Sequence, residues 1–138
     1  MRNAFLLVLL VPVAFASACT SEKGDGTDVR RLQVDLRAPE TSRRVGTATL
    51  TRLGADRTQV KITVSDARRR LGPIHIHRGT CGNATPKPTY TLGPVVAGAA
   101  SPTVAAPLEE LLADDYVLTI HESPEQRATN VACGGLSN

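Results

Sequence analysis

The sequence has few aromatic residues. Its 138 residues include no tryptophan, and phenylalanine and tyrosine occur twice each. Phe5 and Phe15 both lie within residues 1–18, so Tyr90 and Tyr116 are the only large aromatic side chains in the rest of the chain. A core built there must come from valine, isoleucine, leucine and alanine, which bury less area per residue than aromatic rings.

The sequence also lacks a strong charge of either sign. The formal net charge is +3, and residues 1–18 hold Arg2 and no acidic residue, so the rest of the chain carries one charge less, +2. No long basic run and no group of aromatic residues for base stacking occurs, and we therefore expect no nucleic-acid partner. Ser-His-Asp, phosphate-loop and dinucleotide-binding motifs are also missing from the sequence.

The first 18 residues predict a secretory signal peptide. Arg2 precedes an apolar run over residues 4–15, which is too short to span a membrane, and small residues follow it. The next residue, Cys19, makes this junction resemble a bacterial lipobox, with Cys19 as the lipidated first residue. We expect residues 19–30 to form a flexible tether and the protein to be an exported, membrane-anchored lipoprotein. Ordinary cleavage, which gives a soluble secreted protein, is the alternative.

Residues 31–138 have the pattern of a single domain made of short β-strands. Apolar and polar residues alternate clearly over four segments, with turn residues between them: 31–37, 46–51, 59–64 and 116–121. Segments 90–96 and 102–106 predict weaker strands, whereas 108–112 fits either one helical turn or a bulged strand. Short alternating strands with turns at this spacing predict an all-β fold, an antiparallel β-sandwich or flattened barrel.

The three histidines are the most informative residues. Alternation along a strand places His75 and His77 on one face, with Ile74 and Ile76 on the other. His121 ends a second strand. Imidazole suits copper or zinc, and three histidines around an open position are also a catalytic zinc pattern, so the spacing does not choose the metal. Histidines that merely lie on a solvent-facing surface are the alternative.

Two cysteines remain if Cys19 is lipidated. In an oxidising compartment, Cys81 and Cys133 are expected to form a disulfide bond. The alternatives are two buried free thiols, or Cys81 as a soft metal ligand near His77.

The order of these motifs resembles the Cu/Zn superoxide dismutases. An H-x-H strand, a cysteine in the next loop, a strand ending in His121-Glu122 and a last strand with Ala132-Cys133-Gly134 follow one another. The resemblance covers most of residues 31–138, although only these short motifs are specific. It implies a Greek-key β-barrel, superoxide as substrate, and a copper ion held by three of the family's four copper ligands. It also implies that Cys81 and Cys133 form the family's intrasubunit disulfide. The copper ligands that it implies are His75, His77 and His121.

The sequence departs from that family in three respects. It has no histidine left to bridge copper to zinc, so no zinc site is evident. Asn130 stands where the family has an arginine, and the segment from His121 to Cys133 is short.

The strand at residues 46–50 and the H-x-H motif also resemble chordin-type (CHRD) domains, which lack the paired cysteines.

These observations lead to three functional hypotheses. The first is an exported copper-binding lipoprotein that dismutates superoxide at His75, His77 and His121. The second is a protein of the same fold that binds and buffers copper without turnover, and the third is a metal-free structural module of the cell envelope. Glu122 is a candidate for orienting a ligand through a hydrogen bond, although such a carboxylate can also simply be solvated.

Overall fold

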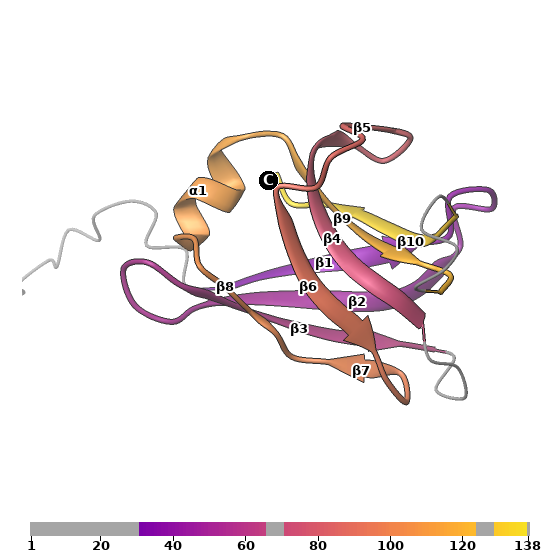
Figure 1. Ribbon diagram of the computed structural model, residues 1–138, viewed down its shortest axis with the longest axis horizontal. Coiled ribbons are helices and arrows are strands. Elements are labelled where there is room, and N and C mark those ends of the chain that lie inside the picture. The colour runs from indigo at the N-terminus through magenta and orange to yellow at the C-terminus, as the bar shows by residue number, and fades with distance from the viewer. Residues whose placement is uncertain (1–30, 66–70, 124–128, 138) are drawn as a thin grey trace, which may run out of the picture.

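A computed structural model describes residues 31–65, 71–123 and 129–137, and most of them lie in antiparallel β-strands (Figure 1). The predicted all-β fold is therefore confirmed. The predicted signal peptide, Cys19 and tether lie outside the described residues. No helix within the described part of the chain is long and apolar enough to cross a membrane.

The elements follow the predicted strands closely. Their bounds are β1 Arg31–Arg37, β2 Arg44–Arg52, β3 Thr58–Val64, β4 Leu71–Thr80, β5 Asn83–Ala84, β6 Tyr90–Val95, β7 Ala99–Ala100, β8 Thr103–Val104, α1 Leu108–Ala113, β9 Tyr116–His121 and β10 Asn130–Gly135. The segment predicted as a weak strand over 102–106 is strand only in the short β8. The segment 108–112, for which the sequence allowed two structures, is the helix α1, because Leu108 and Leu111 lie on one side of it and are fully buried.

The strands form a curled sheet with Greek-key connections. Hydrogen bonding orders them β4-β9-β10-β1-β2-β3-β7, with β6 on the other side of β4 and β8 also paired with β3. The chain runs through β4, β6 and β7 and then returns, so that β9 lies beside β4, which is the Greek-key arrangement. In Figure 1, β4 and β6 cross in front of β1, β2 and β3, and the sheet thus makes two layers.

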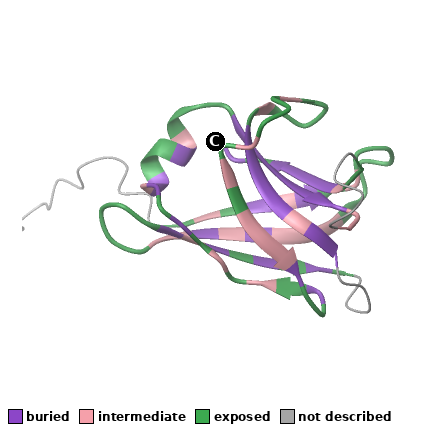
Figure 2. Cartoon of the chain, in the orientation of Figure 1, coloured by how far each residue is buried: buried purple, intermediate pink, exposed green. Residues whose placement is uncertain are grey.

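The hydrophobic core lies between these layers and, apart from the buried Tyr116, is aliphatic, as the composition predicted (Figure 2). Strand β3 shows the expected alternation, since Val60 and Ile62 are fully buried and Lys61 is exposed. Strand β9 is different, because all six of its residues are buried. Both faces of the sheet are therefore covered at β9, and the second covered face carries the candidate site.

Candidate metal centre

The two strands that carry the histidines are hydrogen-bonded neighbours. Strands β4 and β9 run antiparallel, with Ile74 opposite Ile120 and His75 opposite Thr119. The isoleucines of both strands are fully buried in the core, so alternation turns the histidine side chains to the outer face of the sheet. The predicted division of β4 into an isoleucine face and a histidine face agrees with this register.

The three histidine rings form one cluster on that face. One ring nitrogen from each of His75, His77 and His121 lies within 4.8 Å of the others. The rings of His75 and His121 are closest, with 4.7 Å between their centroids and a hydrogen bond of 2.9 Å between His121 Nε2 and His75 Nδ1. Residues 46 positions apart in the sequence therefore meet at one point.

The cluster is buried rather than displayed on the surface. The exposed fractions of His75, His77 and His121 are 9%, 6% and 6%. Their rings line a cavity of about 340 Å³ together with a threonine and three prolines: Thr91, Pro73, Pro86 and Pro88. The alternative that these histidines merely decorate a solvent-facing surface is therefore wrong.

A backbone carbonyl orients one of the three rings. His77 Nδ1 lies 2.7 Å from the carbonyl oxygen of Thr85. That oxygen can only accept a hydrogen bond, so Nδ1 is the donor, and in the neutral ring the lone pair is on Nε2. A hydrogen bond from the second ring nitrogen is the usual support for a metal-binding histidine. His77 is thus oriented to offer Nε2 as a ligand atom.

The separations of the nitrogens fit a small metal ion after modest movement of the rings. Metal–nitrogen bonds of about 2.0 Å in tetrahedral geometry place ligand nitrogens about 3.3 Å apart. One pair of ring nitrogens, His121 Nε2 and His75 Nδ1, is 2.9 Å apart, and one nitrogen from each ring lies within 4.8 Å of the others. These separations are close to what a small ion requires, and the rings would have to move for all three to reach one ion. The group can bind a metal, and its donors suit copper as well as zinc.

The cysteines tie the neighbouring loop to the sheet. Cys81 follows β4, Cys133 lies on β10, and their sulfur atoms are 2.03 Å apart, as in a disulfide bond, with 5.9 Å between the Cα atoms. Both alternatives, free thiols and a Cys81 metal ligand, are wrong in this structure. Cys133 pairs with Thr119 on β9, and Thr119 pairs with His75. The bond therefore fastens the segment that continues to Thr85 directly beside the cluster.

The other predicted residues are less directly placed. Glu122 is half-buried just beyond β9, and its backbone N–H donates to the carbonyl of Thr129 at 3.0 Å. A role for its carboxylate in orienting a ligand stays a prediction. Asn130 pairs with His121 across the β9–β10 ladder and so lies next to the cluster.

Two residues near the centre were not found from the sequence. Thr119 is 1% exposed, and its hydroxyl has no hydrogen-bond partner among the described residues. Alternation along residues 116–121 places Thr119 on the same face as His121, but only the strand register puts it opposite His75. Thr85 contributes through its backbone carbonyl, so its side-chain type carried no signal.

Comparison with protein-family models and with curated proteins gave no match.

Proposed function

We propose that this protein is an exported copper-binding lipoprotein, resembling the Cu/Zn superoxide dismutases, that dismutates superoxide at His75, His77 and His121. The observation that carries the proposal is the buried cluster, in which three ring nitrogens from neighbouring strands lie within 4.8 Å of one another. The disulfide between Cys81 and Cys133, beside the cluster, adds the second feature that the resemblance implies.

Copper is the metal that this donor set favours. All three candidate ligands are neutral imidazoles, and Cys81 is held in the disulfide, so it offers no thiolate. Among divalent first-row metals, nitrogen sites bind copper most tightly. A site of three histidines also leaves a coordination position for a small ligand.

The residues of the chain orient the metal ligands and restrict access to the metal. The carbonyl of Thr85 orients His77, and His75 and His121, now hydrogen-bonded to each other, would have to give up that bond to hold a copper ion together with it. Bound copper supplies one-electron chemistry by alternating between Cu(II) and Cu(I). In the net reaction one superoxide loses an electron to become O₂, and a second gains an electron and two protons to become H₂O₂. The buried rings and the prolines beside them limit access to small ligands.

A positive charge lies near this cavity. Lys87 is exposed and stands between Pro86 and Pro88, which both line the cavity with the histidines. Within the described residues its ammonium forms no ion pair. Arg78 is less suited to attract an anion, because it donates a hydrogen bond to Asp114 at 2.8 Å and lies over the ring of Tyr116. Superoxide is an anion, and Lys87 would raise its local concentration.

The test is superoxide consumption by the copper-loaded full chain. We expect the double variant His75→Ala, His77→Ala to lose the activity, while Gln59→Ala on β3, far from the cluster, keeps it. Equal rates in the double variant and the original protein would rule out this enzymatic function. Lys87→Glu should slow the reaction at low ionic strength and less so at high ionic strength.

The second candidate is copper binding without turnover. It is favoured by Asn130, which lies opposite His121 at the position where the resemblance leads one to expect an arginine. Calorimetric titration with copper separates the two. Tight binding that is lost in His121→Ala, without superoxide consumption, supports a carrier or buffer, whereas the absence of tight binding contradicts both metal-based functions.

Export and lipid anchoring belong to the same proposal. The leader and the Cys19 junction support them, and a disulfide between Cys81 and Cys133 suits an oxidising compartment. Expression with a radiolabelled fatty acid should label the protein and place it in the membrane fraction. Cys19→Ala should abolish the label, and a labelled variant would show that Cys19 is not the lipidated residue.

A further inference from the structure

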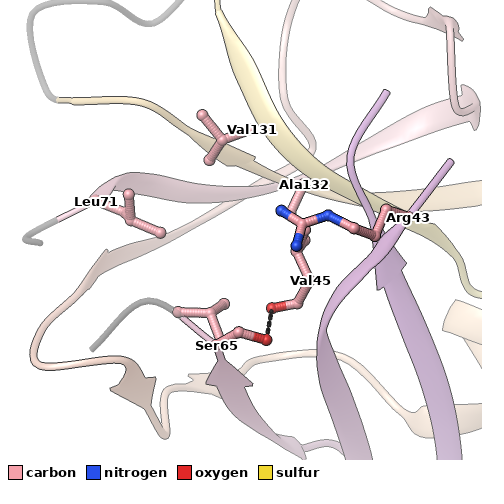
Figure 3. A pocket seen from close by; sticks show the side chains of 7 residues that line it. Arg43, Val45, Ser65, Leu71, Val131 and Ala132 are labelled. Carbon is pink, nitrogen blue, oxygen red and sulfur yellow. Dashed lines mark hydrogen bonds between the residues drawn. The ribbon is translucent and has the colours of Figure 1, made fainter. Parts of the chain in front are cut away.

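A second cavity shares no residue with the metal centre. It has a volume of about 160 Å³ and lies where β2 begins, β3 ends and β10 runs past the start of β4 (Figure 3). Its lining residues are Arg43, Val45, Val64, Ser65, Leu71, Val131 and Ala132.

The walls of this cavity are mostly aliphatic. Val64, Leu71 and Ala132 are buried, and Val45 and Val131 are half-buried against the core. A volume of about 150 Å³ is enough to accept a molecule the size of benzene. The volume therefore suits a compact hydrocarbon group of six or so carbon atoms.

The two polar residues at this cavity, Ser65 and Arg43, differ in whether their side chains form hydrogen bonds within the protein. Ser65 is satisfied within the protein, because its hydroxyl and its backbone N–H both donate to the carbonyl oxygen of Val45, at 3.0 and 2.8 Å. Arg43 is not. Figure 3 shows its guanidinium at the cavity, between Ala132 and Val45.

The neighbouring arginines show what is unusual about Arg43. Arg37 and Arg44 both pair with Asp35, and Arg52 pairs with Glu109. In the described part of the chain, the guanidinium of Arg43 has no carboxylate partner and no hydrogen bond. Arg43 is exposed, and a planar guanidinium binds a carboxylate through two parallel hydrogen bonds.

We propose that this cavity binds a small monocarboxylate with an apolar body. The body occupies the aliphatic walls, and the carboxylate accepts hydrogen bonds from the Arg43 guanidinium. A dianion such as phosphate fits less well, because one guanidinium neutralises one charge and, among the described residues that line the cavity, no other donor is free. The proposal is independent of the metal centre.

Benzoate is a suitable probe, since its ring matches the volume of the cavity. In a titration of the full chain followed by methyl NMR, we expect saturable shifts of the methyl groups of Val45, Val64, Leu71 and Val131. A ligand of this size with one charged contact typically binds with a Kd of about 1 mM. Absence of saturable shifts at these methyl groups up to about 20 mM benzoate, well above that Kd, would overturn the proposal.

Variants separate the two halves of the site. Arg43→Gln should weaken benzoate binding by about tenfold, the effect of losing a charge-assisted pair, and leave benzyl alcohol binding unchanged. The matched control Arg44→Gln should change neither, because Arg44 pairs with Asp35. Val131→Phe should fill the cavity and abolish binding of both probes. Equal benzoate affinity in the original protein and in Arg43→Gln would contradict the role of Arg43.

Discussion

A single backbone carbonyl determines how one histidine can act. The carbonyl of Thr85 accepts a hydrogen bond from His77 Nδ1–H, so in the neutral ring Nε2 is the nitrogen that carries a lone pair. The oxygen belongs to the loop that follows Cys81, so the chemistry of the ring depends on where that loop is held. At the scale of one residue, the position of the Thr85 backbone, and not the type of its side chain, determines how His77 is oriented.

Tyr90 gives a prediction about alkaline pH. Burial, together with its hydrogen bond to Glu110, raises the pKa of Tyr90 to about 12. The unfolded chain loses this proton near pH 10 and the folded protein near pH 12, so the stabilisation is present below about pH 10 and lost as pH rises towards 12. Phenolate absorbance should show the late step, which Tyr90→Phe should remove. Ionisation of Tyr90 near pH 10 would contradict the prediction.

Thr119 gives a second prediction at this scale. Its buried hydroxyl has no partner among the described residues, so Thr119→Val should raise the free energy of unfolding by about 1 kcal/mol. Thr58→Val is the matched control, because the equally buried Thr58 hydroxyl donates to the carbonyl of Ala106 at 2.9 Å. Its loss should destabilise the protein by about 1 kcal/mol. Urea denaturation of the copper-free protein measures both, and equal losses would mean that Thr119 also has a partner.

At the scale of elements, the turn that ends β4 controls the loop beside the cluster. Gly79 has a φ of +107°, its N–H donates to Asp115 at 2.7 Å, and a Cβ atom there would lie 2.3 Å from the carbonyl oxygen of Asn83. Neither atom of this backbone contact can move without shifting β5, the short strand paired with β4. The hairpin therefore requires glycine at this position.

Gly79→Ala should accordingly destabilise the protein by about 2–3 kcal/mol and weaken copper binding, because the Thr85 carbonyl moves with the hairpin. Gly82→Ala is the control. Gly82 also has a positive φ, of +88°, but nothing lies within 4 Å of a Cβ atom there, so we expect a cost of only about 1 kcal/mol and unchanged copper affinity. Thermal unfolding and calorimetric titration measure the two effects. Equal copper affinity in both variants would show that the hairpin does not position His77.

The elements also show what the sequence could and could not predict. Alternation identified β1 and β9 with their observed bounds, and it assigned the histidines of β4 to the face opposite the isoleucines. It did not decide α1, since two leucines three residues apart fit a helical turn as well as an irregular strand. Nor did it reveal that β9 is buried on both faces. Pro86 and Pro88, from the loop that follows the disulfide, line the cavity beside His121, and the position of that loop leaves no local periodic signal.

At the scale of the whole molecule, one disulfide bond joins the loop that follows β4 to β10, the strand on the far side of β9 from β4. Cys81 and Cys133 are separated by 52 positions, and closing a loop of that length stabilises the folded state by about 4 kcal/mol in the chain-entropy model. A small domain whose core lacks tryptophan and phenylalanine depends more than most on such a contribution.

The double variant Cys81→Ser, Cys133→Ser should therefore lose about 4 kcal/mol of unfolding free energy and bind copper less tightly. Cys19→Ser should change neither property, because residue 19 lies before the domain. Denaturant unfolding and copper titration of the three proteins provide the comparison. Unchanged copper affinity in the double variant would separate the stability of the domain from the organisation of its metal centre.

The histidine cluster occupies the outer face of β4 and β9, while the aliphatic core occupies the inner face. Folding and chemistry thus draw on different side chains of the same two strands. Selection can act on one set without disturbing the other. A descendant of this protein that exchanged its imidazoles for other donors, or dispensed with them, would inherit an intact scaffold on which a new activity can arise.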